Sequence, residues 1–155
     1  MGASVVFSVT LRPATLGDCR RIWIWRNDPE SRRASFDSDP IPFETHQAWF
    51  SASLGREDRK LYVIVAEGKE SGVVRLDLSG REAQVSIHLA PEWRFRGVGP
   101  AALQAVADLA FGPFGLERLV ARVKPDNQAS VAAFERAGFT RLKVGPTVFT
   151  FIRSR

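Results

Sequence analysis

The segment at residues 89–99, LAPEWRFRGVG, constrains this chain more than any other, because it places two glycines directly before an apolar helical run. Arg94, Gly97 and Gly99 form an RxxGxG pattern. Glycines let a backbone approach an anion closely, and the first N–H groups of a helix have no partner within it. Pro100 fits the first helical turn, where no donor is lost. The segment predicts a strand, a tight loop and a helix N-terminus that together bind a pyrophosphate.

A loop that uses its glycines for conformation alone would carry the same short pattern, so a second pattern matters. Residues 119–123 have the composition of a strand, and Asn127 and Ser130 then begin a helix that carries Phe134 and ends near Gly138. The two patterns, [Q/R]xxGx[G/A] and then NxxS with F/YxxxGF, resemble the GNAT acetyltransferases over nearly the whole chain. A TIM or Rossmann fold fits less well, because the glycine loop comes late and lacks GxGxxG spacing.

Apolar alternation and turn signals predict the order of elements. Thr15, with Asp18 three residues later, resembles a capping box at a helix start, and residues 31–42 are expected to be irregular or weakly helical. Strands are expected at residues 5–11, 61–66, 72–78, 84–89, 117–123, 140–144 and 147–152, and helices at 15–27, 44–54, 100–111 and 128–137. This order, βααβββαβαββ, is that of the GNAT fold. The resemblance implies an α/β architecture, an α+β mixed sheet whose fourth and fifth strands splay to form a slot for the pantetheine arm of CoA.

Composition predicts one enzyme-sized domain over residues 1–155, because 45% hydrophobic content suffices for a core and no repeat or linker divides the chain. No run of 18 apolar residues and no signal peptide is present in the sequence, so we expect a cytoplasmic protein. Cys19 is the only cysteine and is expected in the core. With only two histidines besides, no metal site is expected.

The formal net charge of +5 and the isoelectric point near 10.1 favour anionic partners, of which CoA is one. Nucleic acid is the competing explanation. The arginines are scattered rather than gathered in one basic helix or tail, and no nucleic-acid-binding module is present. We therefore expect acetyl-CoA and a small amine acceptor as partners, without nucleic acid or membrane, in a monomer or homodimer.

The resemblance also implies which residues contact acetyl-CoA. Family members pair the pantetheine with the fourth strand by backbone hydrogen bonds, and a backbone N–H near its end polarises the acetyl carbonyl. Ile87 and Leu89 are the matching positions, although alternating core residues would satisfy the same pattern. The expected acetyl-CoA contacts are Ile87, Leu89, Arg94, Phe95, Arg96, Gly97, Val98, Gly99, Pro100, Asn127, Ser130 and Phe134.

The first expected helix carries polar residues on an apolar face. On a helical wheel, Arg26 and Asn27 fall on the face formed by Leu16, Cys19, Ile22 and Trp23. An unpaired guanidinium on a buried face is unfavourable, so this break predicts either a polar pocket or an internal hydrogen-bonded network. Fraying at Asn27, with Arg26 reaching water, is the alternative.

The second expected helix shows a similar break, because His46 lies beside aromatic residues at spacings of three and four. A histidine beside aromatic rings is often structural, but two broken faces on consecutive helices are better explained by one shared pocket for the acceptor. The expected acceptor contacts are Trp25, Arg26, Asn27, His46, Trp49 and Phe50.

A finer resemblance concerns the acceptor. The WRN at residues 25–27, the SF at 35–36 and the IPFETHQAWF at 41–50 are similar to the aminosugar N-acetyltransferases of pseudaminic-acid biosynthesis. That resemblance implies transfer to the 4-amino group of a UDP-linked deoxy-aminosugar. N-terminal acetyltransferases of the ribosomal-protein type and aminoglycoside acetyltransferases have related first helices and remain alternatives.

Amide formation requires a group that accepts the amine proton. A base with a pKa near neutrality suits this step, and His46 and His88 are the only imidazoles. Glu92, acting through water, is a third candidate. We prefer His46, because His88 on an alternating strand would serve equally well as a structural residue.

The leaving thiolate needs a proton. The family's usual acid is a tyrosine in the NxxSxxxY series, where this chain has Phe134. The only tyrosine, Tyr62, lies on an earlier strand. We therefore expect Ser130 or ordered water to supply the proton, while a CoA-binding module without catalysis is the alternative.

Overall fold

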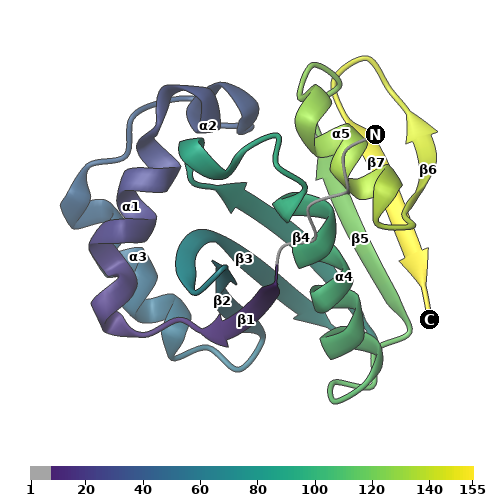
Figure 1. Cartoon of the computed structure of the whole chain (residues 1–155), viewed down its shortest axis with the longest axis horizontal. Coiled ribbons are helices and arrows are strands. Elements are labelled where there is room, and N and C mark those ends of the chain that lie inside the picture. Colours follow the sequence, from purple (N-terminus) through teal and green to yellow (C-terminus); the bar gives the residue numbers. More distant parts are fainter. Residues whose placement is uncertain (1–7) are drawn as a thin grey trace.

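Seven strands form one sheet in the computed structural model, which describes residues 8–155 (Figure 1). Their order across the sheet is β1-β2-β3-β4-β5-β7-β6. The bounds are β1 Val9–Pro13, β2 Arg59–Ala66, β3 Lys69–Ser79, β4 Glu82–Leu89, β5 Arg118–Val123, β6 Thr140–Val144 and β7 Phe149–Ser154. The first four strands form the expected antiparallel meander, and the expected start of the first strand at residues 5–7 lies outside the described residues.

The helices are α1 Cys19–Asn27, α2 Pro29–Ala34, α3 Phe43–Leu54, α4 Val98–Phe111 and α5 Gln128–Arg136, with short 3-10 turns at Leu16–Asp18 and Pro91–Trp93. α4 packs against β1, β4 and β5, and α5 packs beside it, while α1 and α3 pack against β2, β3 and β4 at the other face (Figure 1). The mixed sheet with helices on both faces is the expected fold class.

The structure has a defined helix, α2, that overlaps residues 31–42, which were expected to be irregular or weakly helical. The carboxylate of Asp28 caps this helix by accepting hydrogen bonds from the backbone N–H groups of Glu30 at 3.1 Å and Ser31 at 3.2 Å. Pro29 occupies the first turn. A strong cap therefore produces a helix of only six residues, which is too short for apolar periodicity to reveal.

The sheet splits between β4 and β5, as expected from the resemblance. The two strands pair in parallel only where Glu82, Ala83 and Gln84 face Arg118, Leu119 and Val120. Beyond that point β4 is paired only with β3, and β5 only with β7. An open space therefore lies between the last residues of the two strands.

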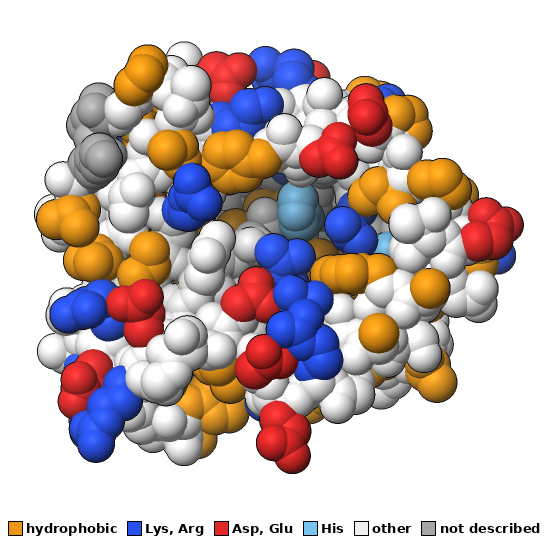
Figure 2. Space-filling model, turned by 180° about the vertical axis from the view of Figure 1, so that it is seen from behind, with side chains coloured by type: hydrophobic (Ala, Val, Ile, Leu, Met, Phe, Trp, Pro, Cys, Tyr) orange, Lys and Arg blue, Asp and Glu red, His pale blue; other side chains and the backbone are white. Residues whose placement is uncertain are grey.

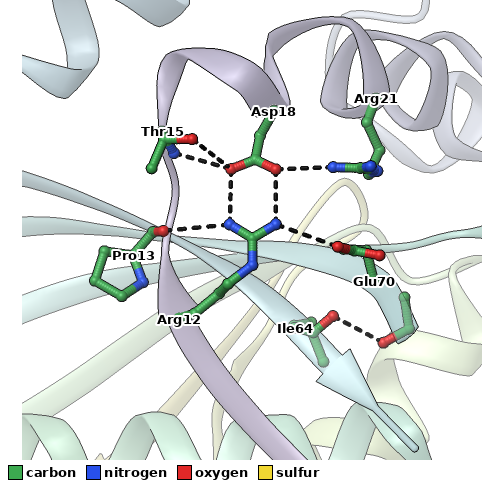
Figure 3. Close-up of polar contacts among 8 residues, drawn as sticks. Arg12, Pro13, Thr15, Asp18, Arg21, Ile64 and Glu70 are labelled. Atoms are coloured by element: carbon green, nitrogen blue, oxygen red, sulfur yellow. Dashed lines mark hydrogen bonds and ion pairs between the residues drawn. The ribbon is translucent and has the colours of Figure 1, made fainter. Parts of the chain in front are cut away.

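β3 has a bulge against β2 at Ser71 and a close approach to β4 at the next residue, Gly72. The register of β2 and β3 shifts between Ile64 and Val65, which leaves Ser71 without a partner residue, and its hydroxyl donates to the Ile64 carbonyl at 3.0 Å (Figure 3). At Gly72, a Cβ atom would lie 2.5 Å from the backbone oxygen of His88. Glycine therefore allows β3 to approach the end of β4 closely.

A network of charged residues joins β1 to the start of α1 (Figure 3). Arg12 donates two hydrogen bonds of 2.8 Å to Asp18, which also accepts from Arg21 at 2.8 Å and from the backbone N–H of Thr15 at 2.9 Å. The hydrogen bond from Arg12 is the main cause that lowers the pKa of the buried Asp18 to about 2. The Thr15 contact is one half of the expected capping box.

The first helical face differs from the helical-wheel expectation. Ile22 lies in the core, but Leu16 is 67% exposed and Cys19 is only half-buried. Trp25, expected to contact the acceptor, is instead a core residue. The 3-10 turn before α1 changes the angle between successive residues, so a wheel drawn through residue 16 misplaces its first member. In the described part of the chain, no helix is long and apolar enough to cross a membrane.

Candidate active site

A cleft of about 1050 Å³ occupies the opening between β4 and β5 and extends between the helices of both faces. Figure 2 shows a hollow on this protein's surface with Lys or Arg side chains and a histidine around it. Of the residues expected at the site, the cleft is lined by Arg26, His46, Trp49, Ile87, Leu89, Arg94, Phe95, Gly97, Gly99, Pro100, Asn127, Ser130 and Phe134. One cavity therefore contains residues from both the expected acetyl-CoA site and the expected acceptor site.

Six expected residues do not line the cleft, namely Trp25, Asn27, Phe50, Glu92, Arg96 and Val98. Three of them, Trp25, Phe50 and Val98, are core residues. Asn27 fixes the chain before α3, because its side-chain amide donates to the Ile41 carbonyl and accepts from the Ile41 N–H, both at 2.7 Å. Glu92 and Arg96 are exposed outside the cleft, where Arg96 donates to the Glu92 carbonyl at 3.1 Å. The geometry thus gives these side chains structural or surface roles.

The N-terminus of α4 opens onto the cleft. Gly97 is the residue before the helix and has a φ of +83°, a left-handed conformation that favours glycine. Phe95 has a φ of +59° and is 88% exposed, so no packing compensates its strained backbone. The first turn contains Pro100, which has no N–H to lose, as expected. This loop and helix start present free N–H groups and the positive end of the helix dipole to an anion.

Arg94 links this loop to α2. Its Nη2 donates to the Asp28 carboxylate at 2.7 Å and to the Ser31 hydroxyl at 2.8 Å. On the opposite side of the cleft, Lys124 donates to the backbone carbonyls of Arg33 and Ser35, both at 3.0 Å. α2 and the residues after it are therefore held to both sides of the split sheet.

The start of α5 contributes the second pattern. The side-chain oxygen of Asn127 accepts from the backbone N–H of Ser130 at 3.2 Å and caps the helix. Phe134 is 2% exposed, and its ring stacks on Phe151 at 5.8 Å and meets Phe139 edge to face at 5.0 Å. An apolar ring therefore stands where the family pattern places a tyrosine hydroxyl, and Ser130 provides the nearest hydroxyl of that series.

The acceptor side of the cleft contains a buried imidazole with both ring nitrogens engaged. His46 is fully buried, its Nε2 lies 2.8 Å from the Cys19 carbonyl, and its Nδ1 lies 3.1 Å from Nη1 of Arg26. Since a carbonyl and a guanidinium fix the donor and acceptor roles, Nε2 carries the proton and Nδ1 accepts from Arg26. Burial, followed by the charge of Arg26, lowers the pKa of His46. This arrangement disfavours His46 as the base, because its one lone pair is occupied.

Arg75 is a cleft residue outside the expected site residues, whereas His88 is one of the three expected candidate bases. Arg75, on β3, lines the cleft, and its Nη2 lies 3.4 Å from the Ser86 hydroxyl on β4. His88 also lines the cleft, and burial, followed by the charges of Arg26, Arg75 and Arg94, lowers its pKa to about 4. A charged Arg75 and Asp77 in the otherwise apolar run of β3 were the signal that could have found this side of the site.

A sheet split between β4 and β5, with a helix N-terminus that opens onto the resulting cleft, defines the fold of acyl-CoA-dependent acyltransferases. A family model described as an acetyltransferase (GNAT) domain matches residues 8–140, and the chain belongs to this family. The resemblance noted from the two sequence patterns is thereby confirmed at the level of the family. Within the described residues, no cluster of His, Cys, Asp and Glu is arranged to hold a metal ion.

The relatives are named for acceptors of different kinds. The chain is 30% identical over 148 residues to the "Putative phosphinothricin acetyltransferase YwnH" of Bacillus subtilis (strain 168), covering 90% of this chain and 89% of the relative. It is 23% identical over 136 residues to spermidine N(1)-acetyltransferase of Escherichia coli (strain K12), covering 86% and 73%. The structure of AAC(6')-Ib in complex with paromomycin and acetyl-CoA superimposes with a TM-score of 0.85 at 18% identity, covering 96% and 94%.

Proposed function

We propose that this acetyltransferase acts on the primary amine of a small, nucleotide-linked aminosugar, at the 4-amino group of a UDP-linked deoxy-aminosugar. The observation that carries the proposal is the single cleft that joins the α4 N-terminus to the chamber of Arg26 and Trp49. Acetyl-CoA, the co-substrate of the family, enters from one end, and the acceptor occupies the other. The WRN and IPFETHQAWF segments that resemble aminosugar acetyltransferases lie at or next to this chamber.

The residues at the α4 end fit the phosphates and arm of CoA. The loop at residues 94–97 and the first turn of α4 would bind the pyrophosphate through backbone N–H groups, because two left-handed residues and a helix N-terminus face the cleft. Ile87 and Leu89, at the unpaired end of β4, would lie along the pantetheine arm. A backbone N–H there has no strand partner on the β5 side and is available to a ligand.

The reaction forms a C–N bond between the amine and the acetyl carbon and breaks the C–S bond of the thioester. The amine loses one proton, and the CoA thiolate gains one. We assign the second proton transfer to Ser130 or water, because Phe134 has no ionisable group. For the first, His88 is the cleft-lining imidazole that makes no hydrogen bond to another described residue, whereas Glu92 lies outside the cleft. We propose that His88, rather than His46, lies beside the amine and that water accepts the proton, because the pKa of His88 is lowered to about 4.

Phosphinothricin is a second candidate acceptor, because the Bacillus relative bears its name and matches nine-tenths of this chain. Peptide N-termini, the acceptors of ribosomal-protein acetyltransferases, are a third class to exclude.

A thiol-release assay with acetyl-CoA tests these proposals directly. The panel contains UDP-linked 4-amino-deoxy sugars, phosphinothricin, spermidine, aminoglycosides and short peptides with free N-termini. We expect the highest kcat/KM with a UDP-linked aminosugar, together with mass-spectrometric detection of one added acetyl group. Faster acetylation of peptide N-termini or of phosphinothricin would overturn the aminosugar assignment.

A further inference from the structure

The acceptor end of the cleft is built from arginines that outnumber their acidic partners. We infer that the acceptor carries an anionic group, a carboxylate or a phosphate, and that Arg26 and Arg75 bind this group beside the end of β4. The inference rests on the proposed acetyl transfer to an amine. It adds a preference for anionic over neutral acceptors, which acetyl transfer alone does not require.

The charges around Trp49 do not balance. The guanidinium groups of Arg26, Arg59 and Arg75 lie 4.3, 5.6 and 5.9 Å from the centre of its indole ring. Asp77 pairs with two of them, at 2.7 Å from Arg59 and 3.0 Å from Arg75. Arg26 pairs with no carboxylate among the described residues. This group of four ionised side chains therefore carries an excess of two positive charges.

Arg26 is held in place by neutral groups only. Its Nη1 donates to Nδ1 of His46 at 3.1 Å, which is its only hydrogen bond to a described residue, and its guanidinium lies over the Trp49 ring. A partly buried guanidinium without an anion is unfavourable, and cation–π contact offsets only part of this desolvation. Because Arg26 also lines the cleft, its remaining donors are available to a ligand. A planar fork of N–H donors matches a carboxylate or phosphate.

Arg75 lies near the end of β4 that borders the cleft, so the proposed anion subsite extends to that end. Its residue lies directly opposite Ser86, two positions before His88, and its side chain reaches the Ser86 hydroxyl. Arg26, Arg75 and Arg94 all act electrostatically on His88, so the positive charges converge on the imidazole that the proposed function places beside the amine. Such a field disfavours an ammonium and favours the neutral amine that reacts. It also disfavours polycations, which carry charges of the wrong sign for this chamber.

Matched acceptors test this preference for anionic acceptors. Thiol release is measured with acetyl-CoA and two pairs, a UDP-linked aminosugar against the same aminosugar without UDP, and phosphinothricin against its methyl esters. Spermidine is included as the polycation. We expect the anionic member of a pair to react with kcat/KM at least about tenfold higher, with spermidine slowest. The pair that shows the difference identifies the anion as a phosphate or as a carboxylate or phosphinate.

Two single variants connect this preference to the subsite. In Arg26→Gln and Arg75→Gln, the ratio of kcat/KM between the anionic acceptor and its matched partner should fall to about threefold or less. The affinity for CoA should stay within about twofold of that of the unmodified protein. The matched control is Arg81→Gln, because Arg81 is exposed, pairs with Glu117 and lies at the opposite end of β4. That control should keep the full preference.

The outcomes separate this inference from the proposed function. A preference for neutral acceptors or spermidine, or an unchanged preference in both glutamine variants, overturns the anionic subsite even if acetyl transfer is observed. If no acceptor is acetylated, calorimetry with UDP and with phosphinothricin, on the protein saturated with CoA, decides the subsite alone. Binding that weakens in Arg26→Gln upholds it, and absence of binding to both probes overturns it.

Discussion

The two ends of the cleft differ in the groups that they offer to a ligand. At the α4 end, the proposed CoA contacts are backbone N–H groups, and the main feature is the left-handed Gly97, where a Cβ atom would meet no other atom within 4 Å. At the other end, the groups are side chains, with Arg26 and Arg75 around Trp49. One end therefore depends on backbone conformation and the other on charge. Substitutions should affect the two ends separately.

The largest effect is expected at the backbone end. Gly97→Val should weaken CoA binding by about 10²-fold, because a β-branched residue is strained at a φ of +83° and moves the N–H groups before α4. Calorimetric titration with CoA measures this. Gly80→Val is the matched control, since Gly80 has a φ of +61° and open space around it but lies in the turn between β3 and β4. Normal CoA affinity in a folded Gly97→Val variant would contradict the proposal that the backbone before α4 binds CoA.

A smaller loss is expected at Ser130, which lines the cleft at the start of α5. Ser130→Ala should lower kcat by less than about 10²-fold, because a thiol with a reference pKa near 8.5 leaves readily without a strong acid. The rate should rise with pH and show no falling limb below about pH 9.5 that a tyrosine would cause. Steady-state kinetics from pH 6 to pH 10 checks both points. A far larger loss, with CoA binding retained, would make Ser130 an essential acid.

At the charged end, His46→Ala should raise the KM for the acceptor by about tenfold, because Arg26 loses the hydrogen bond that orients it. The affinity for CoA should not change. The pH at which kcat/KM rises should also stay the same, since the lone pair of His46 is already occupied. Disappearance of that rising limb would instead identify His46 as the base and contradict a positioning role.

The smallest effect on activity is expected at a site remote from both ends. Asp18→Asn should leave kcat/KM unchanged but lower the free energy of unfolding by about 2 kcal/mol, because the pKa of Asp18 is about 2 in the fold. A depressed carboxyl pKa stabilises the fold above the ordinary value of 3.8, and this contribution is lost as the pH falls toward 2. Urea unfolding at pH 7 and pH 3 measures it. A higher KM for the acceptor in Asp18→Asn would show that the network in Figure 3 also shapes the cleft.

Most of the fold could be predicted from local signals. The meander, α4 and α5 are predicted by apolar runs and turn residues within about a dozen positions of one another. The splay of β4 from β5 was implied by the family resemblance. α2 was missed as a defined helix, because its cap at Asp28 acts over a single turn. Trp25 and Phe50 were assigned to the acceptor, but residues that share a helix with a site residue are as often directed into the core.

By itself, the sequence determined the family, the glycine loop before α4 and the presence of a polar break on the first helix. Glycine spacing before a helix is a local property, and backbone conformation depends on few neighbours. Only the tertiary structure decided which polar groups meet. Arg26 and Arg75 lie on α1 and β3, His46 is satisfied by α1, and Phe134 replaces a hydroxyl with a packed ring. Charge selection depends on distances between distant segments, because Coulomb energy is set in space and not along the chain.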